Sequence, residues 1–197
     1  LASSDLAAGS PVMFDAGRAA AFELLPLLAA APRGFVLVGG DTVRVQLLDV
    51  ALVPLGGAVE LGVGPWVHGA VVASEAGVAV HLSEPYGSKL FLVQDGAVAR
   101  TVPFDGGGKP GLRVALVDEG GSFGMFAPHV DAEGRDGGEL VYRKIAPGGA
   151  SMSERAQLVD FAFDGADPRA LLRLDADVLA ASVRGRQEIV VARLHRP

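Results

Sequence analysis

The sequence predicts an all-β protein made mainly of antiparallel strands, with one short helix near its N-terminus. Between Gly77 and Phe104, three runs rich in Val, Leu and Phe are separated by a Pro-Tyr-Gly-Ser turn and an Asp-Gly turn. Similar runs recur about every ten residues, a rhythm typical of sandwiches, barrels and propellers. Within 89–93 and 187–195, apolar residues point to both faces of the strand. Such strands are expected to be covered on both sides.

The composition favours one β-rich domain over residues 1–197. The formal net charge is −6, and because nucleic acids and anionic membranes select basic surfaces, neither is expected as a partner. The chain has no cysteine, which excludes thiolate nucleophiles and cysteine-ligated metals. It also lacks Asn, and its bias toward Ala, Gly, Val, Leu and Arg indicates a high-GC bacterial genome.

A cytoplasmic location is expected from the absence of membrane-targeting patterns. The main candidate for a membrane span, 19–31, is too short and contains Glu23 and Pro26. It also lacks the basic leader and cleavage pattern of a signal peptide.

The N-terminal region contains the expected helix. Residues 1–15 are predicted to be a flexible segment. Asp15 can cap a helix that begins at Ala16, and Pro26 would kink or end it. The apolar face of this helix would pack against a sheet through Phe22, Leu24, Leu25, Leu27 and Leu28.

From Gly34 onward the patterns predict strands. Clusters such as Gly39-Gly40-Asp41 and Asp95-Gly96 separate them and supply the positive φ angles of tight hairpins. The expected strands are 34–38, 42–53, 57–63, 66–74, 77–83, 88–94, 97–104, 111–117, 121–127, 139–145, 156–163, 169–174, 177–184 and 187–195.

Two architectures fit these strands. The first is a β-sandwich or distorted barrel. The alternative is a partial β-propeller-like array, in which 66–104, 111–163 and 169–195 each form one blade. A possible domain boundary is expected at 104–111, between the first two of these segments. This glycine-rich stretch is either a long loop or a linker.

One set of residues indicates a metal site. His129 and Asp131 form a His-x-Asp pair, and His195 follows near the end of the sequence. This order resembles the facial triad of Fe(II)/2-oxoglutarate oxygenases, and the resemblance implies an iron-dependent enzyme on a β scaffold. It is retained as the alternative function, and His129, Asp131 and His195 are its candidate ligands.

A second pattern is the G-x-S-x-G motif around Ser122. In α/β hydrolases such a turn joins a strand to a helix and exposes a nucleophilic Ser. The glycines and Pro128 that follow are incompatible with that helix, so Ser122 is not assigned a catalytic role.

The residues favour a noncatalytic module that binds a peptide or protein partner, as an accessory protein of a bacterial biosynthetic pathway or assembly. No catalytic group, cofactor or metal is assigned. Trp66 and Tyr86 are the candidate binding residues, because exposed aromatic side chains anchor partners. Exposed sheet edges could add a peptide strand or pair two copies into a homodimer. A further alternative is a fragment of a larger β-propeller.

Overall fold

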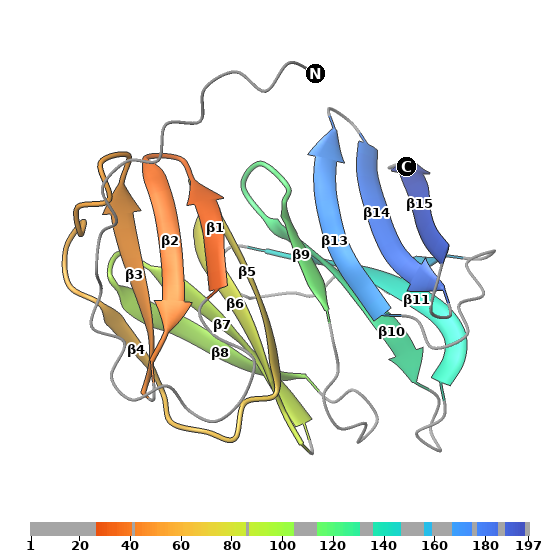
Figure 1. Ribbon diagram of the computed structural model, residues 1–197, viewed down its shortest axis with the longest axis horizontal. Coiled ribbons are helices and arrows are strands. Elements are labelled where there is room, and N and C mark those ends of the chain that lie inside the picture. Colours follow the sequence, from red (N-terminus) through yellow and green to blue (C-terminus); the bar gives the residue numbers. More distant parts are fainter. Residues whose placement is uncertain are drawn as a thin grey trace.

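The computed structural model confirms the all-β class, since its described part consists of antiparallel strands and contains no helix (Figure 1). In the same part of the chain, no helix has the length and apolar character needed to cross a membrane. The predicted helix and the segment 1–15 lie outside the described residues, which are 27–40, 42–85, 87–104, 114–130, 136–146, 156–158, 167–174, 177–184 and 188–195.

The first sheet contains four strands in sequential order: β1 (Leu27–Ala31), β2 (Gly34–Gly39), β3 (Val43–Asp49) and β4 (Val59–Gly62). β1 corrects the sequence analysis, which placed Leu27 and Leu28 on the helix. After Pro26 the chain extends and pairs with β2 along its whole length, from Leu27 opposite Val38 to Ala31 opposite Gly34. Backbone hydrogen bonds to a neighbouring strand outweigh the helix propensity of these residues.

The second sheet is the segment with the strongest hairpin pattern. It contains β5 (His68–Ser74), β6 (Gly77–Glu84), β7 (Gly87–Gln94) and β8 (Ala97–Phe104), again in sequential order. Gln94 lies opposite Ala97, so Asp95 and Gly96 form a two-residue turn, with φ angles of 49° and 75°. Positive φ at both positions is the geometry that Asp-Gly favours between antiparallel strands.

The third and fourth sheets repeat this meander. The third has the order β12-β11-β10-β9 and the fourth the order β13-β14-β15. The strands are β9 (Ala115–Asp118), β10 (Phe123–Val130), β11 (Asp136–Ile145), β12 (Ala156–Leu158), β13 (Asp167–Leu174), β14 (Asp177–Arg184) and β15 (Glu188–His195).

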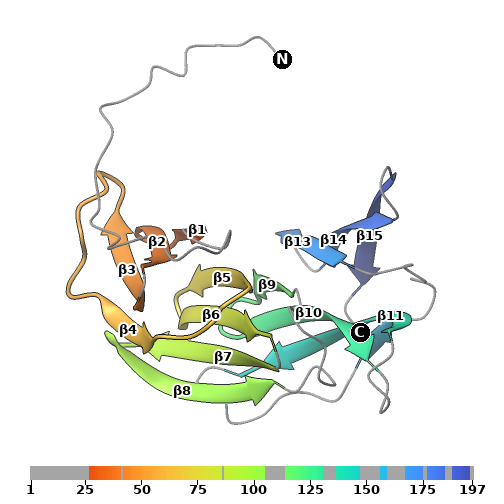
Figure 2. The ribbon, with the colours of Figure 1, turned by 60° about the horizontal axis from the view of Figure 1, so that its bottom comes forward.

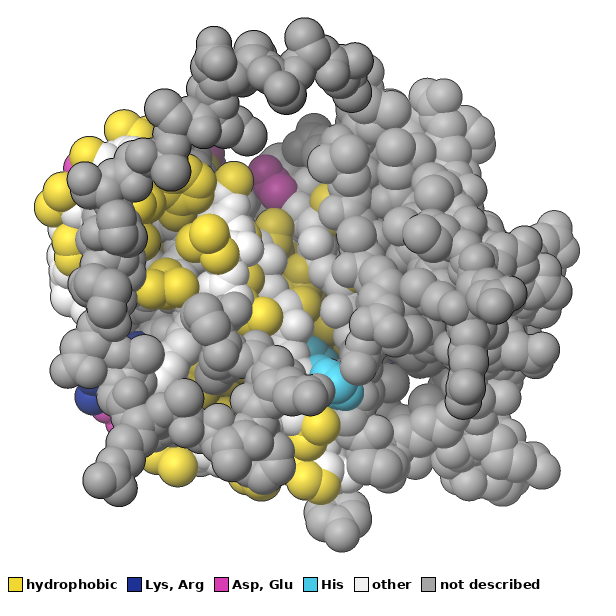
Figure 3. Space-filling model, in the orientation of Figure 1, with side chains coloured by type: hydrophobic (Ala, Val, Ile, Leu, Met, Phe, Trp, Pro, Cys, Tyr) yellow, Lys and Arg dark blue, Asp and Glu magenta, His cyan; other side chains and the backbone are white. Residues whose placement is uncertain are grey.

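The four sheets follow one another around an open arc (Figure 2). The first strand of each sheet lies beside the first strand of the next: β1 beside β5, β5 beside β9, and β9 beside β13. The barrel expectation is therefore wrong, because the described sheets do not close on themselves by hydrogen bonding. The first and second sheets, and the second and third, pack face to face as in a sandwich, and the order of the four sheets is that of the propeller-like array. Seen from the open side, hydrophobic side chains gather on the first sheet (Figure 3).

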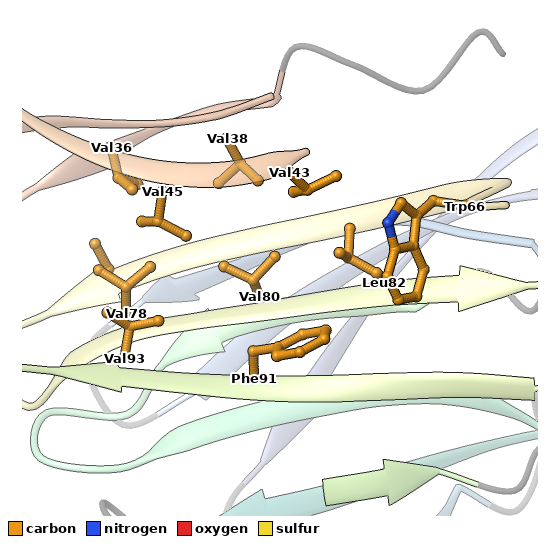
Figure 4. Close-up of a cluster of buried hydrophobic side chains, with 11 residues drawn as sticks. Val36, Val38, Val43, Val45, Trp66, Val78, Val80, Leu82, Phe91 and Val93 are labelled. Carbon is orange, nitrogen blue, oxygen red and sulfur yellow. The ribbon is translucent and has the colours of Figure 1, made fainter. Parts of the chain in front are cut away.

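Among the described side chains, the core consists of two hydrophobic clusters on opposite faces of the second sheet. The first cluster joins the first and second sheets and includes Val36, Val45, Val80 and Phe91 (Figure 4). The second joins the second and third sheets and includes Leu90, Leu92, Phe123 and Ile145. Adjacent residues Leu90 and Phe91 thus point to different clusters, as the two-sided apolar pattern of this strand predicts.

Candidate functional site

Trp66, a predicted binding residue, lies in the first core cluster and is only 6% exposed. Its ring meets the ring of Phe91 edge-on, with centroids 6.1 Å apart and an interplanar angle of 83°. The ammonium of Lys89 lies 5.3 Å from the centroid of the indole, and Lys89 also pairs with Glu84 at 2.7 Å. Packing and a cation–π contact account for this environment, while a binding role for Trp66 stays a prediction.

Tyr86, the second predicted binding residue, lies outside the described residues. The described residues on either side of it belong to the β6–β7 hairpin, in which Glu84 lies opposite Gly87. This confirms the hairpin that the sequence predicts at this position, and the role of Tyr86 in binding remains a prediction.

The two candidate iron ligands that lie on described strands, His129 and His195, belong to different sheets. His129 belongs to β10 and His195 to β15, and the side chains of both are outside the described part, as is Asp131. β10 lies close to β13, whereas β15 is on the opposite side of β14 in the fourth sheet. Among the described side chains, no group of three or more His, Asp or Glu residues is arranged to hold a metal ion.

Ser122 lies in the turn between β9 and β10, where its carbonyl accepts a hydrogen bond of 2.9 Å from the Glu119 amide. The residue is buried, and strand β10 begins immediately after it. A nucleophile elbow requires a helix at that position. The turn at Ser122 is therefore followed by a strand and does not have the strand-to-helix geometry of a nucleophile elbow.

His81 is a fully buried titratable group in the second sheet, and it lies opposite Leu90 on β7. Burial, with a smaller contribution from the charge of His68, lowers the pKa of His81 to about 3. The imidazole is therefore neutral at pH 7. Since the side chain is fully buried, its environment is that of a core residue.

The outer edge of the second sheet is built against strand addition. β8 pairs with β7, and the register shifts between Leu92 and Val93, which indicates a bulge. Arg100 and Pro103 are exposed on β8. Bulges, charges and proline all oppose the pairing of a further strand.

Sequence reasoning missed the most exposed apolar feature of the described residues, the turn after β3. Its side chains Val50, Val53 and Leu55 are 80%, 55% and 42% exposed. The expected strand 42–53 ends at Asp49 instead. The chain reverses there and runs back along β3, with the Leu55 amide donating to the Leu47 carbonyl at 2.8 Å. We call residues 50–55 the apolar tip.

Asp49 holds the apolar tip in its conformation. One carboxylate oxygen, Oδ1, accepts hydrogen bonds of 2.8 Å from the amides of both Ala51 and Val53. The Asp49 amide in turn donates to the Val53 carbonyl at 2.9 Å. Leu52 takes a left-handed φ of 64°, which costs a non-glycine residue about 1–2 kcal/mol. The hydrogen bonds to Asp49 offset this cost.

Replacement of Asp49 by Ala is expected to destabilise the protein by about 1–2 kcal/mol, because two amides lose their acceptor. Urea unfolding of the full chain measures the change. Asp49→Asn is the matched control, since its amide oxygen can still accept both hydrogen bonds, and it should remain within about 0.5 kcal/mol of the wild type. Equal stability of Asp49→Ala and wild type would show that the carboxylate does not hold the tip.

The sequence contained one signal for the apolar tip. The run Val-Ala-Leu-Val-Pro-Leu follows Asp49 directly, and an Asp before a continuous apolar run is able to hydrogen-bond the backbone and end a strand. The alternation from Val43 to Leu47 obscured this signal, because the apolar residues that follow make 42–53 look like one continuous strand.

Comparison with known proteins adds no assignment, since neither a family model nor a curated protein sequence matches this chain. The candidate site therefore rests on its geometry: exposed apolar side chains presented on a hydrogen-bonded turn.

Proposed function

We propose that this protein is a noncatalytic binding module that recognises a peptide or protein partner through the apolar tip. The observation that carries the proposal is the exposure of Val50, Val53 and Leu55 on one short turn. Burial of an exposed aliphatic side chain contributes about 1.5–3 kcal/mol. Three such residues supply enough driving force for a specific contact.

Preorganisation of the tip supports the same proposal. A turn that is already held by Asp49 loses little conformational entropy when a partner binds. A mobile apolar loop would lose much of the binding energy to its own ordering. Here the hydrogen bonds form within the chain, so the apolar contact contributes more fully to affinity.

The chemistry of the tip indicates an apolar partner surface. The six residues from Val50 to Leu55 contain no charged side chain. A partner that places Leu, Ile, Val or aromatic side chains on the tip would bury both surfaces. The tip would thus be the centre of a contact whose polar rim comes from neighbouring residues.

Selection of peptides from a random display library against the full chain tests the proposal. Peptides selected from a random library are titrated against wild type and the double variant Val50→Asp, Val53→Asp by isothermal calorimetry. Affinity is expected to fall at least tenfold in the double variant, because two buried contacts are replaced by carboxylates.

Val63→Asp is the matched control, since Val63 is 77% exposed but lies outside the tip, between β4 and β5. Its affinity for the peptides should stay within about twofold of wild type, as a surface change away from a contact predicts. Thermal unfolding confirms that both variants fold. Peptides that bind the double variant as tightly as wild type would overturn the proposal.

A further inference from the structure

The outward side of the first sheet differs from the faces that pack within the arc. The second sheet is covered on both sides by the two core clusters. The first sheet packs one side, with Val36 and Val38, against the second sheet. On its other side no described sheet lies against it, and Leu28 is 64% exposed.

This outward side carries apolar residues in cross-strand rows. Leu28 lies opposite Leu37, and Ala30 lies opposite Phe35. Side chains directly opposite on one face pack together, so these four residues form one surface, which we call the far face. Figure 3 shows hydrophobic side chains gathered on this part of the molecule.

The far face is most apolar on the inner strands of the first sheet. Its apolar residues lie on β1 and β2, the two strands of the first sheet that contact β5 of the second. Towards the outer edge the same side carries Arg44 opposite Glu60, and both are exposed. The apolar part of the far face therefore lies at the inner end of the first sheet, where successive sheets of the arc meet through their first strands.

We infer that the far face binds a second copy of this chain, so that two arcs join head to tail. If the contact pattern of the arc continues, the first strand of a further sheet lies beside β1, on the side opposite to β5. In the described arc, β13 holds the last such position beside β9. The fourth sheet of one copy would pack on the far face of the other.

Two-fold symmetry closes such an assembly, because each copy contributes one far face and one fourth sheet. The resulting ring would contain eight antiparallel sheets, within the size range of β-propellers. This gives the larger-propeller alternative a specific form. It does not depend on the apolar tip, which lies on a turn and not on the far face.

Light scattering coupled to size-exclusion chromatography tests the assembly. The mass measured for wild type is expected to be about twice the chain mass of 20.2 kDa. Leu28→Asp should raise the dissociation constant of the dimer at least a hundredfold. Val63→Asp should remain dimeric. A wild-type monomer at about 100 μM would overturn the inference, as would a Leu28→Asp variant that dimerises like wild type.

Cysteine cross-linking tests the head-to-tail arrangement directly. Because the chain has no native cysteine, every disulfide that forms must join the introduced cysteines. Leu28→Cys is mixed with a second chain carrying Leu171→Cys or Leu172→Cys, the two adjacent positions on β13. Disulfides between unlike chains are expected for one of these positions. If Leu28→Cys cross-links only to itself, the far faces meet each other and the head-to-tail inference is wrong.

The two proposals can fail separately. The double variant Val50→Asp, Val53→Asp should lose peptide binding and remain dimeric, whereas Leu28→Asp should lose the dimer and keep peptide binding. If Val50→Asp, Val53→Asp abolished the dimer while Leu28→Asp did not, the dimer contact would lie on the tip and the far-face inference would be overturned.

Discussion

Acidification is expected to destabilise the protein through His81, at up to about 1.4 kcal/mol per pH unit between pH 6.5 and pH 3. Burial lowers the pKa of His81 to about 3 in the folded state, against 6.5 for an ordinary histidine. Below pH 6.5 the unfolded chain binds a proton that the folded protein does not. The contribution of His81 to stability is therefore complete above pH 6.5 and is lost as the pH falls toward 3.

Urea unfolding at pH 7, 5.5 and 4 measures this effect, in wild type and in His81→Leu. Carboxylates also affect acid stability, but they contribute equally to both proteins. The difference in the free energy of unfolding between the two proteins should therefore change with pH at a slope that corresponds to close to one bound proton. His81→Gln provides a second nontitrating variant in case Leu packs poorly. Parallel pH profiles for wild type and both variants would show that His81 does not titrate in this range.

Truncation of either Leu90 or Phe91 is expected to destabilise the protein strongly, although the two residues are adjacent and face opposite sides of β7. Leu90→Ala should cost about 2–5 kcal/mol and Phe91→Ala about 3–5 kcal/mol, because each leaves a cavity in a packed cluster. Leu90 is 1% exposed in the second cluster, and Phe91 is buried in the first. In a sheet with one face exposed to solvent, only one of these two substitutions would be strongly destabilising.

Equilibrium unfolding in urea measures both changes against Thr101→Ala. Thr101 lies opposite Phe91 on the outer strand β8 and is exposed, so its truncation should stay within about 0.5 kcal/mol. If Leu90→Ala were as mild as Thr101→Ala, the contact between the second and third sheets would contribute little to stability.

Strand pairing was predictable where turn chemistry and alternation agree. The two-residue turn at Asp95 and Gly96 joins β7 to β8 as its sequence indicates, because this dipeptide adopts positive φ at low cost. The blade segments 66–104, 111–163 and 169–195 correspond to the second, third and fourth sheets. Hairpins depend on neighbouring residues, so a single sequence carries the information for them.

Two parts of the first sheet were not predictable in the same way. Leu27 and Leu28 have helical propensity, but pairing with β2 makes them a strand. The apolar tip was read as the end of a strand, because its residues are as apolar as a strand interior. In both places the outcome depends on which backbone groups hydrogen-bond, and hydrophobicity does not encode that choice.

The sequence by itself determined the all-β class, the hairpins and the two-sided burial of the second sheet. These follow from side-chain alternation and turn residues, which act over a few positions along the chain. The tertiary structure alone decided that Trp66 is buried, that Val50 and Val53 are exposed, and that successive sheets form an open arc. The physical reason is that burial and exposure arise from packing between sheets that are distant in sequence.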